Sequence, residues 1–259
     1  MVRKELYLSM TVSMHAKDRL IFPLDVPTAL EARKYVGLLG EHVGVFKVGL
    51  ELFVSEGPSV VDRIADFTDA KIFLDLKFHD IPVTVQGAIR SASSLRRANF
   101  VTVHCDQGHR LLEAVVDEVP DRTKVFAVTV LTSLDASDLL ALGIRPELAE
   151  DPVQLVLRKT TIAKNAGCAG VVCSGREVEA VKREFGEDLI VVTPGIRPEW
   201  AGVKGDDQKR VVTPYQAITS GADYIVVGRP IGGAADPVQA AARVVEEIEG
   251  ALKDRHERG

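Results

Sequence analysis

Residues 73–84, Phe73-Leu-Asp-Leu-Lys-Phe-His-Asp-Ile-Pro-Val-Thr84, join an apolar run to a proline that can start a helix. Side chains of an extended strand alternate between its two faces, so Asp75 and Lys77 should share one face, about 7 Å apart along the strand. Pro82 suits the first turn of a helix, where no backbone N–H is needed. The stretch therefore predicts a buried strand, a charged strand end and a helix, in that order.

Apolar runs of the same kind recur along the chain, and segments with a helical pattern stand between them. Together with residues 71–76, the predicted strands are 20–24, 43–48, 100–104, 124–130, 170–173, 189–193 and 224–227. The predicted helices are 29–36, 83–97, 111–119, 135–142, 152–165, 176–185, 214–220 and 237–253. Strand and helix are thus expected to alternate.

Most of these strands are apolar on both faces, which is typical of a parallel sheet covered on both sides. Eight strand–helix units in 259 residues predict a single-domain α/β fold, the (β/α)8 TIM barrel, with its site at the carboxyl ends of the strands. The alternative is a doubly wound open sheet, but no Gly-x-Gly-x-x-Gly follows the first strand. Pro23 fits a closed barrel poorly, because a barrel has no edge strand to accommodate a missing N–H.

Composition limits the classes of partner. A net charge of −5 argues against nonspecific binding to nucleic acid or to an anionic membrane. Cys105, Cys168 and Cys173 lack the spacing of a disulfide framework or a zinc site, so we expect a reduced, cytoplasmic setting and no metal. Residues 1–18, without an apolar run long enough for a signal or membrane segment, are expected to be an N-terminal extension that can be disordered, followed by the catalytic barrel at 19–259.

Charged residues stand at the ends of the first three predicted strands: Asp25, Lys47, and Asp75 with Lys77. Asp75 and Lys77 alone could be an internal salt bridge, and Lys47 alone could extend to solvent. Four opposed charges from three neighbouring strands exceed what packing needs, so the pattern predicts a charge network in a site. His104, the last residue of the fourth predicted strand, is expected to be structural.

Two loops near the C-terminus carry glycine and arginine. Thr193-Pro-Gly-Ile-Arg-Pro198 follows the seventh strand, with Gln208 further on, and Gly228-Arg229 follows the eighth. Barrels commonly bind phosphate with these two loops, where backbone N–H groups and guanidinium groups meet an anion. Alternatively, the glycines and prolines only form turns and the arginines are solvated. The two loops together favour a phosphorylated substrate.

The chain closely resembles the orotidine 5′-phosphate decarboxylase family, in its bacterial form. The resemblance rests on Asp25, Lys47, Asp75-x-Lys77-x-x-Asp80-Ile81-Pro-x-Thr84, Thr193-Pro-Gly-Ile-Arg197 and Gly228-Arg229-Pro230, and it spans residues 19–238. It implies decarboxylation of orotidine 5′-monophosphate to uridine 5′-monophosphate, the last step of de novo pyrimidine biosynthesis, without metal or organic cofactor.

The resemblance also implies a role for each matched residue. Lys77 would protonate the carbanion at carbon 6, Asp75 would lie beside the departing carboxylate, and Lys47 and Asp80 would complete the catalytic set. Asp25 and Lys47 would contact the ribose, Thr132 the pyrimidine, and Arg197, Gln208, Gly228 and Arg229 the phosphate. Asp80, Ile81 and Thr84 would reach the partner's site in a homodimer.

Three rival functions stay open at this stage. A sugar-phosphate relative, such as 3-keto-gulonate 6-phosphate decarboxylase or hexulose 6-phosphate synthase, shares Asp-x-Lys-x-x-Asp and uses magnesium. A catalytically silent phosphate-binding barrel would bind ligand without turnover. A purely structural protein is disfavoured by the clustered charges.

Overall fold

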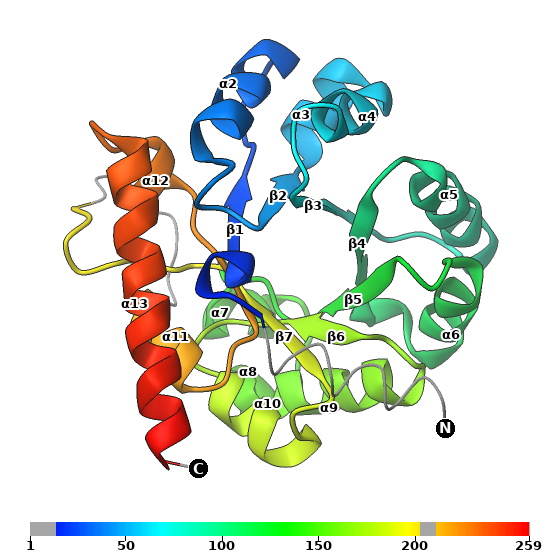
Figure 1. The fold of residues 1–259 in the computed structure, drawn as a ribbon. Helices are drawn as coiled ribbons and strands as arrows, with labels where there is room; N and C mark the ends of the chain where they lie inside the picture. Colours follow the sequence, from blue (N-terminus) through cyan, green and yellow to red (C-terminus); the bar gives the residue numbers. More distant parts are fainter. Residues whose placement is uncertain (1–13, 203–210, 259) are drawn as a thin grey trace.

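The computed structural model describes residues 14–202 and 211–258. Within them, eight parallel strands close into a barrel in the order β1 to β8, with helices around the outside (Figure 1). The strands are β1 Leu20–Pro23, β2 Val45–Val48, β3 Lys71–Phe78, β4 Ala98–His104, β5 Lys124–Val128, β6 Gly170–Val172, β7 Ile190–Thr193 and β8 Tyr224–Val226. The predicted single-domain (β/α)8 barrel is therefore confirmed.

The helices cover the outer face of the strands (Figure 1). The longer ones are α2 Ala29–Leu39, α5 Pro82–Ser94, α6 His109–Glu118, α9 Pro152–Asn165, α10 Val178–Phe185 and α13 Pro237–Arg258. The shorter ones are η1 Ala16–Arg19, α3 Leu50–Glu56, α4 Ser59–Ala65, η2 Cys105–Gln107, α7 Ala136–Ala141, α8 Pro146–Ala149, α11 Pro214–Thr219 and α12 Arg229–Gly232. Of the predicted extension, residues 1–13 lie outside the described residues, and Ala16 of η1 is buried in the core.

The crossover between β2 and β3 was not predicted. It consists of two seven-residue helices, α3 and α4, separated by Gly57 and Pro58. Gly57 has a φ of 72°, which ends α3 in a conformation that favours glycine. Because each helix makes only about two turns, neither carries enough apolar repeats to give a helical pattern.

The strands divide the apolar core into two parts. Alternate residues of β3 show the division, because Phe73 points into the barrel while Ile72 and Leu74 pack against the surrounding helices. The barrel interior is filled by Ile21, Val45, Phe73, Phe100, Phe126, Ile190, Val192 and Tyr224. Phe73 meets both Phe100 and Phe126 edge-on, at centroid distances of 5.9 and 6.0 Å. This apolar interior layer lies directly below the charged residues at the carboxyl ends of the strands.

Pro23 occupies the last position of β1 without losing a ladder hydrogen bond. Leu24 N donates to Lys47 O of β2 at 2.8 Å, so the nitrogen of Pro23 faces the other neighbour, β8. Pairing with β8 already ends at the Ile21–Val226 pair. The proline ring then packs against Gly228, where a Cβ would come within 2.9 Å of Pro23 Cγ. The missing N–H therefore falls beyond the last paired residues of β1 and β8.

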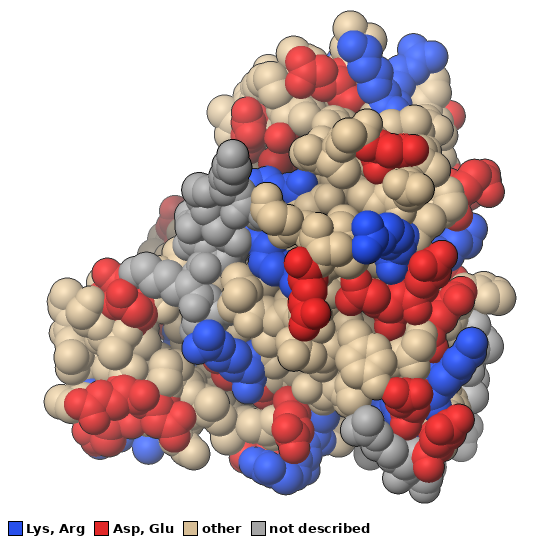
Figure 2. Space-filling view, turned by 90° about the vertical axis from the view of Figure 1, so that its left-hand side faces the viewer, with Lys and Arg blue, Asp and Glu red and all other residues tan. Residues whose placement is uncertain are grey.

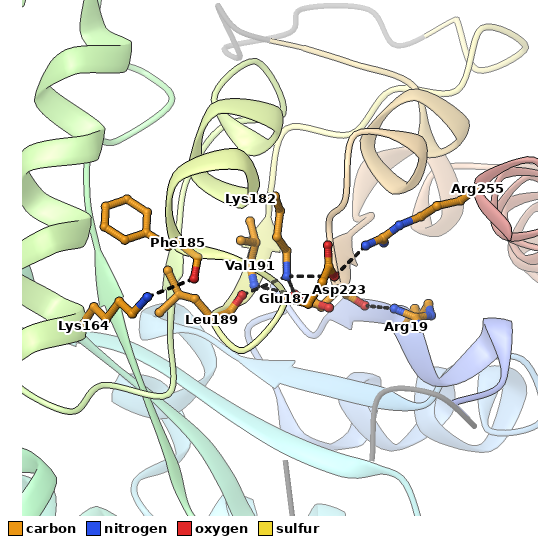
Figure 3. A network of polar contacts seen from close by, with 9 residues as sticks. All are labelled: Arg19, Lys164, Lys182, Phe185, Glu187, Leu189, Val191, Asp223 and Arg255. Carbon is orange, nitrogen blue, oxygen red and sulfur yellow. Dashed lines mark hydrogen bonds and ion pairs between the residues drawn. The ribbon is translucent and has the colours of Figure 1, made fainter. Parts of the chain in front are cut away.

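A buried ion pair closes the opposite, amino-terminal end of the barrel (Figure 3). Lys182 Nζ of α10 lies 2.9 Å from Asp223 Oδ2, and both side chains are about 5% exposed (6% and 5%). Asp223 also accepts a hydrogen bond from Val191 N of β7, and Lys182 donates to Leu189 O. The pair therefore joins α10, β7 and the start of β8 at a position remote from the strand carboxyl ends.

The outer surface mixes charges. On the face shown in Figure 2, lysine and arginine side chains are interspersed with aspartate and glutamate, so this face presents no continuous basic area. In the described part of the chain, no helix has the length and apolarity needed to cross a membrane.

Candidate active site

A pocket of about 360 Å³ opens at the carboxyl ends of the strands. Most of the site residues predicted from the sequence line it: Asp25, Lys47, Asp75, Lys77, Thr132, Arg197, Gly228 and Arg229. They come from six strand ends or the loops that follow them. The topology thus gathers residues more than two hundred positions apart in the sequence.

Four charged side chains form a continuous chain of contacts along one side of the pocket. Lys47 Nζ lies 3.0 Å from Asp25 Oδ1 and 3.6 Å from Asp75 Oδ2. Lys77 Nζ lies 2.8 Å from the same Asp75 Oδ2. The side chains of Lys47 and Asp75 are 11% and 13% exposed, whereas Lys77 is 32% exposed and faces the open pocket. The predicted charge network is present.

Asp75 is held ionised by its neighbours. Burial alone would raise the pKa of this carboxyl, because a charge is poorly solvated in the interior. The nearby Lys47 and Lys77 ammonium groups, and hydrogen bonds from Lys77 and Thr102, outweigh burial and hold the pKa below its ordinary value. An anion fixed here would repel a second carboxylate placed beside it while attracting a cation.

The backbone of β3 changes conformation at Lys77. The pairing of β3 with β4 is regular at Leu74–Val101, resumes at Phe78–Val103, and shifts register in between. Lys77 has a φ of 50°, which is uncommon for a residue with a Cβ. The regular alternation from which Asp75 and Lys77 were predicted to share one face therefore ends in a bulge, a feature often found next to active sites.

Two residues that the sequence reasoning missed support these charges. Thr102 of β4 donates from Oγ1 to Asp75 Oδ1 at 3.0 Å and accepts from Lys77 N at 2.9 Å. Gly49 leaves room for the ion pair, because a Cβ there would lie 3.0 Å from both Asp25 Oδ1 and Lys47 Nζ. Thr102 could have been found as the inward residue of the strand beside Asp75, and Gly49 gave no recognisable signal.

The loops after β7 and β8 bring two arginines to the pocket. Arg197 follows β7, where its backbone N donates to Val212 O at 2.8 Å across a short parallel bridge between Ile196 and Val212. Arg229 begins α12 directly after Gly228. The pocket is thus lined by these two arginines as well as by the charge network. Gln208, predicted to join the arginines, lies outside the described residues.

The remaining predicted residues do not line this pocket. Asp80, Ile81 and Thr84 are exposed at the start of α5, and Ile81 is 61% exposed. His104, at the end of β4, does not line the pocket either; its ring lies 5.2 Å from that of His79, and its Nδ1 lies 3.3 Å from Asp106 Oδ2. Within residues 14–202 and 211–258, no group of three or more His, Cys, Asp or Glu side chains is arranged to hold a metal ion.

Comparisons with known proteins agree on one family. The family model described as "Orotidine 5′-phosphate decarboxylase / HUMPS family" matches residues 18–244. The chain is 49% identical over 238 residues to an orotidine 5′-phosphate decarboxylase of Desulfosudis oleivorans, covering 92% of this chain and 95% of that protein. It is 42% identical over 253 residues to the enzyme of that name from Moorella thermoacetica, covering 94% and 97%.

A solved structure gives the same answer at the level of the fold. The crystal structure of orotidine 5′-phosphate decarboxylase from Lactobacillus acidophilus superposes with a TM-score of 0.74 at 34% identity, covering 88% of this chain and 98% of that one. The barrel therefore has its counterpart in a solved member of the same family. The chain belongs to the orotidine 5′-phosphate decarboxylase / HUMPS family.

Proposed function

We propose that this chain converts orotidine 5′-monophosphate into uridine 5′-monophosphate and carbon dioxide, the last step of de novo pyrimidine biosynthesis. Family membership supports the substrate, and one observation carries the chemistry: the Lys77 ammonium is paired with Asp75 at the wall of the pocket. The two arginines that line the same pocket suit the substrate's phosphate. The enzyme would be a carboxy-lyase that needs no cofactor.

In the proposed reaction, the bond between carbon 6 and the carboxylate breaks, and its electron pair stays on carbon 6. Lys77 stabilises the carbanion that develops there and transfers a proton to it, after which the neutral amine regains a proton from solvent. Asp75 lies beside the departing carboxylate, and repulsion between the two negative charges favours loss of the substrate's carboxylate. An ammonium aimed at charge that grows during the reaction stabilises the transition state more than the ground state.

The other predicted residues would bind the rest of the substrate. Asp25 and Lys47 would contact the ribose and Thr132 the pyrimidine. The phosphate would be held by Arg197, Gln208, Gly228 and Arg229. Binding energy from the distant phosphate can help exclude water from the reacting base, which raises the rate without contact at carbon 6.

The proposal includes a homodimer in the cytoplasm. Asp80, Ile81 and Thr84 are exposed and lie outside the pocket of their own chain, which supports a role in a partner's site. Asp80 would there complete the set formed by Lys47, Asp75 and Lys77. An exposed Ile81 at a strand–helix junction is the kind of apolar group that an interface covers.

Loss of substrate absorbance tests the proposal. Purified protein is mixed with orotidine 5′-monophosphate and EDTA, the ultraviolet absorbance is followed, and released carbon dioxide is trapped. Substrate loss with equimolar carbon dioxide is expected. Turnover of a keto-sugar phosphate that EDTA abolishes would instead favour the magnesium-dependent sugar-phosphate relatives, and binding without turnover would favour a silent barrel.

A further inference from the structure

Thr102 is a fully buried polar residue at the base of the charge network. It lies on β4 between Val101 and Val103, which both pack in the outer core, so its side chain points to the barrel interior. It does not line the pocket, and so it does not reach the substrate proposed above. A polar group in this position needs partners from within the protein.

The chemistry of its two partners decides in which hydrogen bond the Thr102 hydroxyl donates and in which it accepts. Lys77 N–H can only donate, so Thr102 Oγ1 accepts there, at 2.9 Å. The single hydroxyl proton is then available for Asp75 Oδ1, 3.0 Å away, and a carboxylate held ionised can only accept. Thr102 therefore links the backbone of one network member to the carboxylate of another.

This link falls at the bulge in β3. Between the Leu74–Val101 and Phe78–Val103 pairs the register shifts, and Thr102 is the β4 residue that stands opposite the interruption. Its hydroxyl receives the Lys77 N–H in the place of a backbone carbonyl of the ladder. A positive φ at a lysine persists only where its surroundings hold it, and this hydrogen bond is such a restraint.

The same hydroxyl also sets the orientation of Asp75. With Oδ1 engaged by Thr102, the other oxygen, Oδ2, faces both ammonium groups, at 2.8 Å from Lys77 and 3.6 Å from Lys47. Rotation of the carboxylate would break the hydrogen bond between Thr102 and Oδ1 and would turn Oδ2 away from the ammonium groups. The Thr102 side chain thus restrains both Asp75 and Lys77, the ion pair that the proposed reaction uses.

We propose that Thr102 is a positioning residue that aligns Asp75 and Lys77 for decarboxylation, an inference that rests on the proposed function. Thr102→Val keeps the shape of the side chain and removes both hydrogen bonds. Because each bond involves a charged or strained member of the network, kcat should fall about 10- to 100-fold, with KM changed less than about threefold. Thr102→Ser retains the hydroxyl and should keep kcat within about threefold of wild type.

Thr123→Val is the matched control. Thr123 is also buried, and its Oγ1 donates to Ala98 O at 2.8 Å, at the opposite end of β4. This variant should lose stability while keeping the wild-type kcat. If Thr102→Val does not fold, Thr102→Ala removes the same hydrogen bonds with less bulk, and the same loss of kcat is expected.

The outcomes separate the two proposals. Activity in wild type and Thr102→Ser with a large loss of kcat in Thr102→Val supports the role of Thr102. A wild-type kcat in Thr102→Val or Thr102→Ala, a Thr102→Ser variant as slow as Thr102→Val, or an equal loss of kcat in Thr123→Val would overturn it while leaving the proposed function intact. A wild-type chain that does not decarboxylate orotidine 5′-monophosphate would overturn both.

Discussion

Lys77 Nζ lies 2.8 Å from Asp75 Oδ2, although the two residues are only two positions apart on β3. Alternate residues of a regular strand point to the same face with their Cα atoms roughly 7 Å apart, so their charged ends must lean together to make this contact. Here the bulge at Lys77 and the Thr102 hydroxyl accompany it. A buried ion pair is seldom a net source of stability. Its presence at the wall of a pocket is better explained by chemistry.

The lowered pKa of Asp75 should make the free energy of unfolding depend on pH in acid. Its native pKa is lowered, so in acid the unfolded chain takes up a proton that the native state does not bind. The stability that this group contributes is complete above its ordinary pKa of 3.8 and is lost as pH falls through its native pKa. In Asp75→Asn, the slope of unfolding free energy against pH, measured by urea unfolding, should be shallower below pH 4 by up to about 1.4 kcal/mol per pH unit.

Thr123→Val serves as the control for that measurement, since it removes a hydrogen bond but no titrating group. Its unfolding free energy should be lower than that of wild type by the same amount at every pH. Parallel curves for wild type and Asp75→Asn would show that Asp75 is not held ionised by the network.

Arg229→Ala should weaken productive binding of the substrate. Loss of a hydrogen bond from a guanidinium to a phosphate should raise KM by about 10- to 100-fold in steady-state assays, on the scale of charge-assisted bonds. Arg176→Ala is a matched control, because Arg176 also follows a glycine after a barrel strand but is exposed and does not line the pocket. Equal KM values for Arg229→Ala and wild type would remove Arg229 from the phosphate site.

Mixing two inactive variants tests the shared site of the proposed homodimer. Lys77→Ala and Asp80→Ala should each be inactive, but a mixed dimer would hold one site with Lys77 from one subunit and Asp80 from the other. Random exchange of subunits should restore about a quarter of wild-type activity. Activity that stays at the level of the separate variants, once exchange is shown by tagged subunits, would place Asp80 outside the partner's site.

The Lys182–Asp223 pair should support stability and leave turnover unchanged (Figure 3). Lys182→Met leaves the Asp223 carboxylate buried with Val191 N but without its counter-ion. Breaking one side of such a pair should lower the unfolding free energy by about 3–5 kcal/mol. Urea unfolding together with kcat in native buffer checks both parts, and a loss below about 1 kcal/mol or a changed kcat would contradict the separation of the two barrel ends.

Much of the barrel could be predicted because a strand that is buried on both faces needs apolar residues along its length, and this pattern can be read in the sequence. A continuous apolar run such as Val125–Val128 marks a parallel strand covered on both faces, and Pro82 marks the helix that follows β3. The charged strand ends could be predicted to meet because a barrel brings all carboxyl ends to one side. Asp25, Lys47 and Asp75 accordingly lie in one network.

The rest depends on geometry that local pattern does not encode. The two short helices after β2 have too few turns to show a period, and Pro23 looked unfavourable because the end of β1–β8 pairing at Val226 is set by barrel closure. The bulge at Lys77 follows from an interrupted register with β4, so the part played by Thr102 becomes visible only when both strands are placed.

The role of Lys77 in decarboxylation is tested most directly by comparing wild type with Lys77→Ala on orotidine 5′-monophosphate in EDTA. Absorbance loss and carbon dioxide release are followed, and circular dichroism verifies the fold. Removing the ammonium takes away both the stabilisation of the carbanion and its proton donor. We predict rapid stoichiometric conversion by wild type and no detectable turnover by a folded Lys77→Ala. Wild-type-like turnover in that variant, or none in wild type, would contradict this prediction.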